Sequence, residues 1–323
     1  MAKFWHTRVS LFIASIFFLS ACSSQTGVQG ISPAEIPSAQ PETWSLYAPA
    51  STSSIPVMLA AQELENVELT LYTSQEQANT LFARGEVSVL VSGLSVGLGL
   101  FRNGLPVQMS ASYVSGLSYL VTTDPVVHSF ADLGGREVYV PFAGSPIEEV
   151  CRHLAAQEGL AWGEEILPVY APFDSSIALL KDGQAEAVIL PEPNVSLVES
   201  QPGLYVSAGL YDLWNAAHPG EDGYPQVGVF VNSAWAQTHP DQVNALHAAL
   251  ARAIERVQND SQGAVEAVSA QFQPPVSVLE SALARTQYRL YTGAAMLDWV
   301  EAYYRTIGSE MDDESAFFFI AAE

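Results

Sequence analysis

The sequence predicts an α/β protein of two lobes, each a mainly parallel sheet flanked by helices, with a helical C-terminal segment. From Trp44 onward, short apolar strands alternate with helical segments, which is typical of βαβ units and parallel sheets. The chain has 323 residues, more than one hydrophobic core usually holds. Near the C-terminus, apolar residues such as Val243, Leu246 and Leu250 recur at helical spacing.

Turn residues and caps set the predicted boundaries of the elements. Serine before proline starts helices, as at Ser145, and glycine ends them, as at Gly85 and Gly159. The predicted strands cover 44–49, 67–72, 87–91, 106–113, 119–123, 137–140, 166–170, 187–190 and 226–231. The predicted helices cover 56–61, 75–84, 94–103, a turn at Phe130, 146–157, 174–181, 207–217, 241–258, 261–271, 277–286 and 293–307.

Residues 1–21 are typical of a secretory signal. A basic start precedes an apolar run at 9–19, which is too short for a ~30 Å hydrocarbon core. The segment 19–22 reads LSAC and resembles the bacterial lipobox, in which the cysteine is diacylated and becomes the first residue. We expect a lipid anchor at Cys22 on the outer face of a bacterial membrane; the alternative is an ordinary signal peptide cut near Ala21. Residues 22–41 are rich in Ser, Gln, Gly and Pro and predict a flexible tether.

Charge and cysteine content exclude several function classes. The chain carries a net charge of −23, and nucleic-acid binding needs clustered Lys and Arg instead. Besides Cys22 the sequence has only Cys151, so a lipidated chain has no internal disulfide. Cys151 lies in an apolar helical pattern and is predicted to be buried and inert.

Four segments resemble the family of solute-binding proteins that take nitrate, aliphatic sulfonates, taurine and thiamine pyrimidine precursors for ABC importers. The segments are 81–90 (LFARGEVSVL), 132–141 (DLGGREVYVP), 180–193 (LKDGQAEAVILPEP) and 227–232 (VGVFVN), the last followed by His239-Pro240. Ser88 and Glu186 stand where the family usually has aspartate. The resemblance implies the type II periplasmic-binding fold, with two hinge strands joining a first lobe of 42–118 plus 228–323 to a second lobe of 119–227. It also implies a monomer that delivers its ligand to an ABC permease and its ATPase.

Ligands of open α/β sheets bind at the carboxyl ends of strands, near helix N-termini. This rule selects loops after several predicted strands and aromatic side chains near them. The candidate ligand-binding residues are Tyr47, Ser51, Thr52, Ser92, Gly93, Tyr113, Phe142, Gly144, Ser145, Glu192 and Asn194. Further aromatic candidates are Tyr119, Tyr170, Phe173, Trp214 and Tyr224. Each has a plainer alternative: helix capping for the loop residues, core packing for the aromatics, and a cap or hinge contact for Glu192.

No Lys or Arg falls in these loops, which favours a neutral or weakly charged heterocycle, such as a vitamin precursor, over nitrate, taurine or a sulfonate. The sequence contains no P-loop, dinucleotide fingerprint, nucleophile elbow or histidine pair at metal-ligand spacing. We therefore expect a binding protein without a cofactor or metal, and not an enzyme. The alternative is a ligand-sensing or interaction lipoprotein of the same fold, which genomic neighbourhood would distinguish from a transport receptor.

Overall fold

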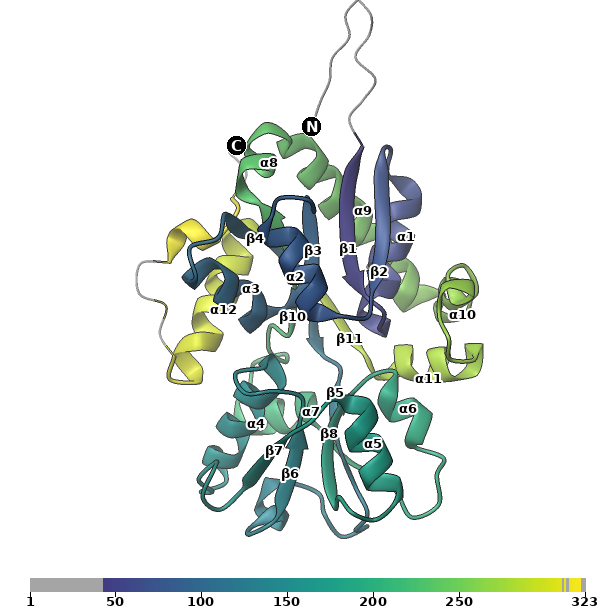
Figure 1. Cartoon of the computed structure of the whole chain (residues 1–323), viewed down its shortest axis with the longest axis vertical. Helices are drawn as coiled ribbons and strands as arrows, with labels where there is room; N and C mark the ends of the chain where they lie inside the picture. Colours follow the sequence, from purple (N-terminus) through teal and green to yellow (C-terminus); the bar gives the residue numbers. More distant parts are fainter. Residues whose placement is uncertain (1–42, 310, 312–313, 321–323) are drawn as a thin grey trace, which may run out of the picture. The chain divides into compact units, whose positions relative to one another are not determined.

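Two β-sheets organise the chain. The computed structural model describes residues 43–309, 311 and 314–320; the predicted signal, Cys22 and the tether lie outside them. Within these residues, the first sheet has the strand order β11-β4-β10-β3-β1-β2 and the second the order β7-β6-β8-β5-β9 (Figure 1). The predicted two-lobed α/β fold is therefore confirmed, while the exact residues at which one lobe gives way to the other stay a prediction.

The first sheet draws its strands from both ends of the described chain. They are β1 (Trp44–Pro49), β2 (Val67–Tyr72), β3 (Val89–Gly93), β4 (Val107–Gly116), β10 (Val227–Asn232) and β11 (Gln287–Thr292). The helices that share a buried core with one face are α1 (Ile55–Glu63), α9 (Pro240–Asn259), α10 (Ser261–Glu266) and α11 (Val276–Arg285). The helices on the other face are α2 (Gln75–Ala83), α3 (Leu94–Arg102) and α12 (Gly293–Thr306), and α8 (Ser233–Thr238) follows β10.

The second sheet comes from the middle of the chain. Its strands are β5 (Ser118–Thr122), β6 (Glu137–Val140), β7 (Leu167–Tyr170), β8 (Ala187–Pro191) and β9 (Tyr205–Gly209). The helices α4 (Pro146–Gln157) and α7 (Leu210–Ala217) cover one face, and α5 (Phe173–Lys181) and α6 (Asn194–Val198) the other. Short 3-10 helices span Thr52–Ser54, Phe130–Leu133, Ser269–Gln271 and Ser315–Phe317.

Both sheets are mixed, so the prediction of mainly parallel sheets is wrong in this detail. β1 pairs in parallel with β2 and β3, and β6 pairs in parallel with β7 and β8. β10 enters from the other lobe between β3 and β4 and runs antiparallel to both. β5, which continues from β4, likewise runs antiparallel to β8 and β9. Within a βαβ unit the two strands are parallel because the helix carries the chain back to the edge of the sheet where the first strand began. A strand that arrives from the opposite lobe enters at the other edge and therefore runs antiparallel to its neighbours.

Two strands of the structure have no counterpart in the sequence prediction. Residues 207–209, predicted as the start of a helix, end strand β9, and the helix α7 begins at Leu210. Strand β11 lies between α11 and α12, where the sequence predicts no element between the helices 277–286 and 293–307. It pairs with β4, so a distant partner determines its conformation.

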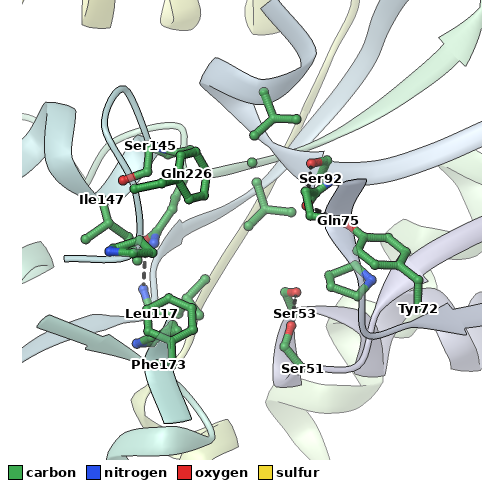
Figure 2. Close-up of a pocket in the computed structure, with 18 residues that line it drawn as sticks. Ser51, Ser53, Tyr72, Gln75, Ser92, Leu117, Ser145, Ile147, Phe173 and Gln226 are labelled. Carbon is green, nitrogen blue, oxygen red and sulfur yellow. Dashed lines mark hydrogen bonds between the residues drawn. The ribbon is translucent and has the colours of Figure 1, made fainter. Parts of the chain in front are cut away.

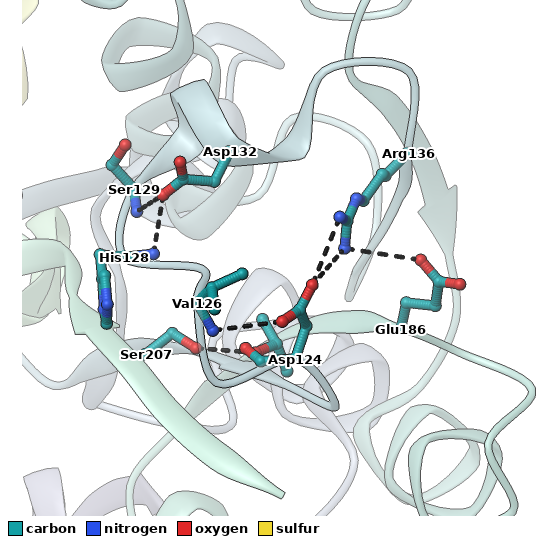
Figure 3. Close-up of polar contacts among 9 residues, drawn as sticks. Asp124, Val126, His128, Ser129, Asp132, Arg136, Glu186 and Ser207 are labelled. Carbon is teal, nitrogen blue, oxygen red and sulfur yellow. Dashed lines mark hydrogen bonds and ion pairs between the residues drawn. The ribbon is translucent and has the colours of Figure 1, made fainter.

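A polar network shapes the end of the second sheet where the resemblance motif 132–141 begins (Figure 3). Asp132 accepts a hydrogen bond from the backbone N–H of His128 at 2.8 Å, which lowers the pKa of its carboxyl group. The Arg136 guanidinium pairs with Asp124 at 3.3 Å and with Glu186 at 3.7 Å. Asp132 and Arg136 therefore organise the turn before β6, and Glu186 serves there as an ion-pair partner.

One hydrophobic cluster continues from the first lobe into the second. Leu90 and Leu94 of the first lobe belong to the same buried cluster as Val150 and Trp214 of the second. Cys151 lies in this cluster with no exposed surface, as predicted, and burial raises the pKa of its thiol. Among the described residues, every helix falls short of the length and apolar character that crossing a membrane requires.

Candidate functional site

A cavity of about 200 Å³ lies between the two lobes, where strands of both sheets end. Figure 2 shows polar groups from the first lobe on one side and side chains of the second lobe and the hinge on the other. The lining residues are Pro49, Ser51, Ser53, Tyr72, Gln75, Ser92, Gly93, Val96, Leu117, Pro141, Phe142, Ser145, Pro146, Ile147, Phe173, Pro191, Gln226 and Val227. A cavity of this size suits a small ligand.

The loop after β1 supplies hydroxyl groups to the first-lobe wall. Pro49 ends β1, and the chain turns at once into the 3-10 helix Thr52–Ser54. The hydroxyl oxygens of Ser51 and Ser53 lie 2.6 Å apart. One of these hydroxyls donates its proton to the other, so the proton of the second hydroxyl is available to a ligand.

A second part of this wall is a hydrogen-bond network that joins the ends of β2 and β3. The Ser92 hydroxyl donates to Gln75 Oε1 at 3.2 Å. The Tyr72 hydroxyl lies 3.0 Å from the same oxygen and 2.8 Å from the carbonyl oxygen of Val91. Burial raises the pKa of Tyr72 to about 12, so this phenol remains a neutral hydrogen-bond donor. The network fixes Gln75 and Ser92 against the cavity.

The second-lobe wall is formed by the turn from β6 into α4. Ser145 is the N-cap of α4, and its hydroxyl oxygen accepts a hydrogen bond from the Glu148 N–H at 3.1 Å. Pro146 occupies the first turn, where its missing N–H costs nothing. Phe142 lines the cavity while remaining 45% exposed, so it lies near the cavity rim.

Gln226 forms the hinge side of the cavity, just before β10. Its Oε1 accepts from the Leu117 N–H at 3.1 Å, and its Nε2 donates to the Ser118 hydroxyl at 2.7 Å. The first partner lies between β4 and β5 and the second begins β5. Gln226 therefore connects the outgoing and returning crossings of the chain at the cavity wall.

The cavity lining contains no Asp, Glu, Lys, Arg or His side chain among the described residues. Two buried carboxylates follow lining residues, those of Glu148 and Glu192, and both already have hydrogen-bond partners. Glu192 follows the lining residue Pro191 but accepts from the N–H and hydroxyl of Ser196, each at 3.1 Å, and pairs with Arg285 at 3.6 Å. Burial raises the pKa of its carboxyl group. Of the alternatives for Glu192, the structure shows the helix-capping contact.

The structure brings some of the predicted ligand-binding residues together at this cavity and places others away from it. Those that line it are Ser51, Ser92, Gly93, Phe142 and Ser145. Those outside its lining are Tyr47, Thr52, Tyr113, Gly144, Glu192 and Asn194. Their contact with a ligand stays a prediction.

The predicted residues outside the lining have identifiable structural surroundings. Tyr113 is fully buried, and its hydroxyl donates to the Ser53 carbonyl at 2.8 Å. The Thr52 hydroxyl lies 3.2 Å from that of Thr286. Tyr47 packs against the hydrophobic core, and Asn194 begins α6.

Four polar lining residues are missing from the predicted ligand-binding residues: Tyr72, Gln75, Gln226 and Ser53. The first two flank the loop after β2, to which the rule of strand carboxyl ends also applies. Gln226 precedes a strand instead of following one. It reaches the cavity because β10 enters the first sheet from the hinge, which the sequence pattern does not reveal.

The family model described as NMT1/THI5 like matches residues 61–264. A search of curated protein sequences finds no match. Solved structures resemble the chain at low identity, which indicates a shared fold. The periplasmic aliphatic sulphonate binding protein SsuA from Escherichia coli is 15% identical with a TM-score of 0.69, covering 83% of this chain and 86% of that one.

Two other structures align over similar lengths. The ligand-binding component of an ABC-type import system from Staphylococcus aureus, solved with zinc bound, is 12% identical with a TM-score of 0.71, covering 86% of this chain and 97% of that one. The alkanesulfonate-binding protein SsuA from Xanthomonas axonopodis pv. citri, bound to MOPS, is 16% identical with a TM-score of 0.67, covering 85% and 96%.

Proposed function

The chain belongs to the NMT1/THI5-like family, and we propose on this premise that it is an extracytoplasmic solute receptor for an ABC importer. It captures a small molecule between its lobes and presents it to a permease and its ATPase. The observation that carries the proposal is the interlobe cavity, which is small and lined by both lobes and the hinge. Such a site binds and releases its ligand as the lobes close and open.

We propose that the ligand is neutral or weakly charged, with a heterocycle favoured over a sulfonate, taurine or nitrate. Proline, aliphatic and aromatic side chains dominate the lining, and its polar groups are hydroxyls and amides. Burying an anion without a cationic partner costs several kcal/mol. A flat apolar ring with a few hydrogen-bonding atoms matches this lining better.

Among the described residues, four α-helices begin at the cavity lining: Gln75 opens α2, Gly93 precedes α3, Ser145 precedes α4 and Phe173 opens α5. Three of them, α2, α4 and α5, carry an acidic residue in the first turn. The N-terminal end of α4 carries a partial positive charge that favours anions. However, its first turn contains Glu148, whose carboxylate accepts a hydrogen bond from the Gly144 N–H and offsets that charge. Ser145 also satisfies the N–H of Glu148. This end of α4 therefore offers an anionic ligand little stabilisation.

Isothermal titration of the purified chain against a thiamine pyrimidine, riboflavin, taurine and an alkanesulfonate tests the ligand class. We expect saturable one-to-one binding of a neutral heterocycle. Tight binding confined to the sulfonate would refute the neutral-ligand proposal while leaving the receptor role intact. Turnover of any of these compounds would refute the receptor role itself.

A pair of serine variants tests the site. Ser92→Ala removes a hydroxyl from the cavity wall, and we expect the affinity to fall about two- to tenfold, as for one hydrogen bond. Ser110→Ala is the matched control, because Ser110 is equally buried and donates to the Val229 carbonyl at 3.3 Å outside the cavity lining. Equal effects of the two changes would argue against this cavity as the binding site.

We propose that Cys22 anchors the receptor near its permease, where a two-chain lipid holds it and the tether raises its local concentration. Cys22→Ala is expected to release a chain that keeps its full ligand affinity, measured by fractionation and by titration of the released protein. A membrane-bound Cys22→Ala chain would refute the anchor.

A further inference from the structure

The two lobes touch each other directly beside the cavity. On the first lobe, the contact is the turn from β3 into α3, with Gly93 and Ser95. On the second lobe, it is the turn from β6 into α4, with Gly144 and Pro146. The Ser95 hydroxyl donates to the Gly144 carbonyl oxygen at 2.9 Å, which is a full hydrogen bond between the lobes.

Pro146 occupies the space that a side chain at position 93 would need, so only glycine fits there. The backbone angles of Gly93, φ −65° and ψ 147°, are open to any residue, so conformation does not require glycine. A Cβ atom at this position would lie 2.6 Å from Pro146 Cγ. The proline ring is rigid, so a side chain at 93 would push the second lobe away. Gly93 therefore permits the approach of the lobes, in addition to lining the cavity.

Glu148 holds the second-lobe side of this contact. Gly144 has φ +73°, a left-handed conformation that glycine adopts without strain, and its N–H donates to Glu148 Oε2. The other carboxylate oxygen accepts from Trp162 Nε1 at 3.1 Å and from the Tyr170 hydroxyl at 2.6 Å. Glu148 is only 4% exposed, so its carboxylate depends on these donors and in turn fixes the turn that carries Gly144.

We propose that Glu148 is the positioning residue for lobe closure: it presents Gly144 and Pro146 so that Ser95 and Gly93 can engage them. The contact then acts as a latch that holds the lobes together over the cavity. The proposal concerns closure and is independent of the identity of the ligand.

A cysteine pair measures the latch without any ligand. The Cβ positions of residues 93 and 146 lie 3.7 Å apart, within the 3.5–4.5 Å that a disulfide requires. We expect the full-length chain with Gly93→Cys and Pro146→Cys to form this disulfide in a glutathione redox buffer. The ratio of disulfide to thiol reports the effective concentration of the two thiols. A pair that stays reduced would overturn the proposal.

The control pair is Gly99→Cys with Pro146→Cys. A Cβ atom at Gly99 has no neighbour within 4 Å, so this pair should remain reduced. Cys151 is buried and should stay unlabelled by a maleimide in the folded chain. A disulfide in the control pair would show that the assay does not report the closed conformation.

Glu148→Gln in the 93/146 cysteine background tests the positioning role. The glutamine NH₂ group cannot accept a hydrogen bond, so either Gly144 or the Trp162 and Tyr170 pair loses its acceptor. We expect the effective concentration to fall at least threefold and the Trp162 indole N–H resonance to shift. Glu164→Gln removes the same charge from an exposed residue of the same lobe and should change neither quantity.

Ser95→Ala gives a second measurement if Glu148→Gln fails to fold. It removes only the first-lobe donor, on a partly exposed residue. We expect a two- to tenfold lower effective concentration, as for one hydrogen bond. An unchanged value in Ser95→Ala, or in a folded Glu148→Gln chain, would overturn the latch.

Discussion

Replacing Arg285 by methionine should destabilise the chain much more than the same change at Arg252. Arg285 lies on α11 of the first lobe and pairs with the fully buried Glu192 of the second at 3.6 Å. It also pairs with Glu199 and donates to the Ser196 hydroxyl at 3.0 Å. The Arg252–Glu63 pair is shorter, at 2.7 Å, but its side chains are 58% and 43% exposed.

The burial of the ion pair, and not its N–O distance, determines how much free energy of unfolding each arginine variant loses. Removing one partner of a buried ion pair costs about 3–5 kcal/mol. Arg285 is 29% exposed and Glu192 would keep two hydrogen bonds from Ser196, so we expect about 2 kcal/mol for Arg285→Met. An exposed pair contributes about 0–1 kcal/mol, so Arg252→Met should cost less than 1 kcal/mol.

Urea unfolding at several pH values provides the assay. Burial raises the pKa of Glu192 above its ordinary 4.5, and Arg285 opposes this rise, so Arg285→Met should raise the pKa further. The folded variant then retains a proton that the unfolded chain has released, and its free energy of unfolding falls as the pH increases above about 4.5. The deficit relative to the wild-type chain should therefore grow from pH 5 to pH 8. Equal costs for the two arginine variants, or a deficit that shrinks over this range, would refute the reasoning.

Two further predictions concern packing in the first lobe. In Gly97→Ala the added Cβ would lie 2.1 Å from Phe230 Cε1, so we expect the free energy of unfolding in urea to fall by about 2–3 kcal/mol. Gly99→Ala has open space around the added Cβ and should raise the free energy of unfolding by about 0.5–1 kcal/mol. Equal stability of the two variants would contradict the packing. Tyr113→Phe removes the donor to the Ser53 carbonyl and should cost about 1–2 kcal/mol with ligand affinity unchanged, while lost affinity at unchanged stability would place Tyr113 in the binding site.

Local sequence signals identified the parts of the site that depend on local structure. Gly-Ser-Pro predicted the start of α4, and the structure has Ser145 as N-cap and Pro146 in the first turn. Gly93 was predicted as a ligand-binding residue from its place after a strand. The structure shows that Pro146 of the other lobe approaches it, a contact that no local pattern contains.

Other parts of the site depend on how distant strands meet. β4 is buried on both faces over most of its length, so its sequence has no alternation to show that Tyr113 points into the core. β11 becomes a strand by pairing with β4, far away in the sequence. For the same reason, the sequence placed Glu192 beside the presumed ligand but could not show that Ser196 and Arg285 already satisfy its carboxylate.

The neutral cavity and the interlobe contacts support one account of closure. A strongly charged ligand can draw two lobes together through its own ion pairs, but a neutral ligand in this lining has only hydroxyl and amide partners. The protein itself must then supply much of the free energy of closing. The Ser95–Gly144 hydrogen bond and the Arg285–Glu199 ion pair are direct contacts between the lobes that can supply this free energy. The same account requires that weakening either contact should lower ligand affinity even though neither lines the cavity.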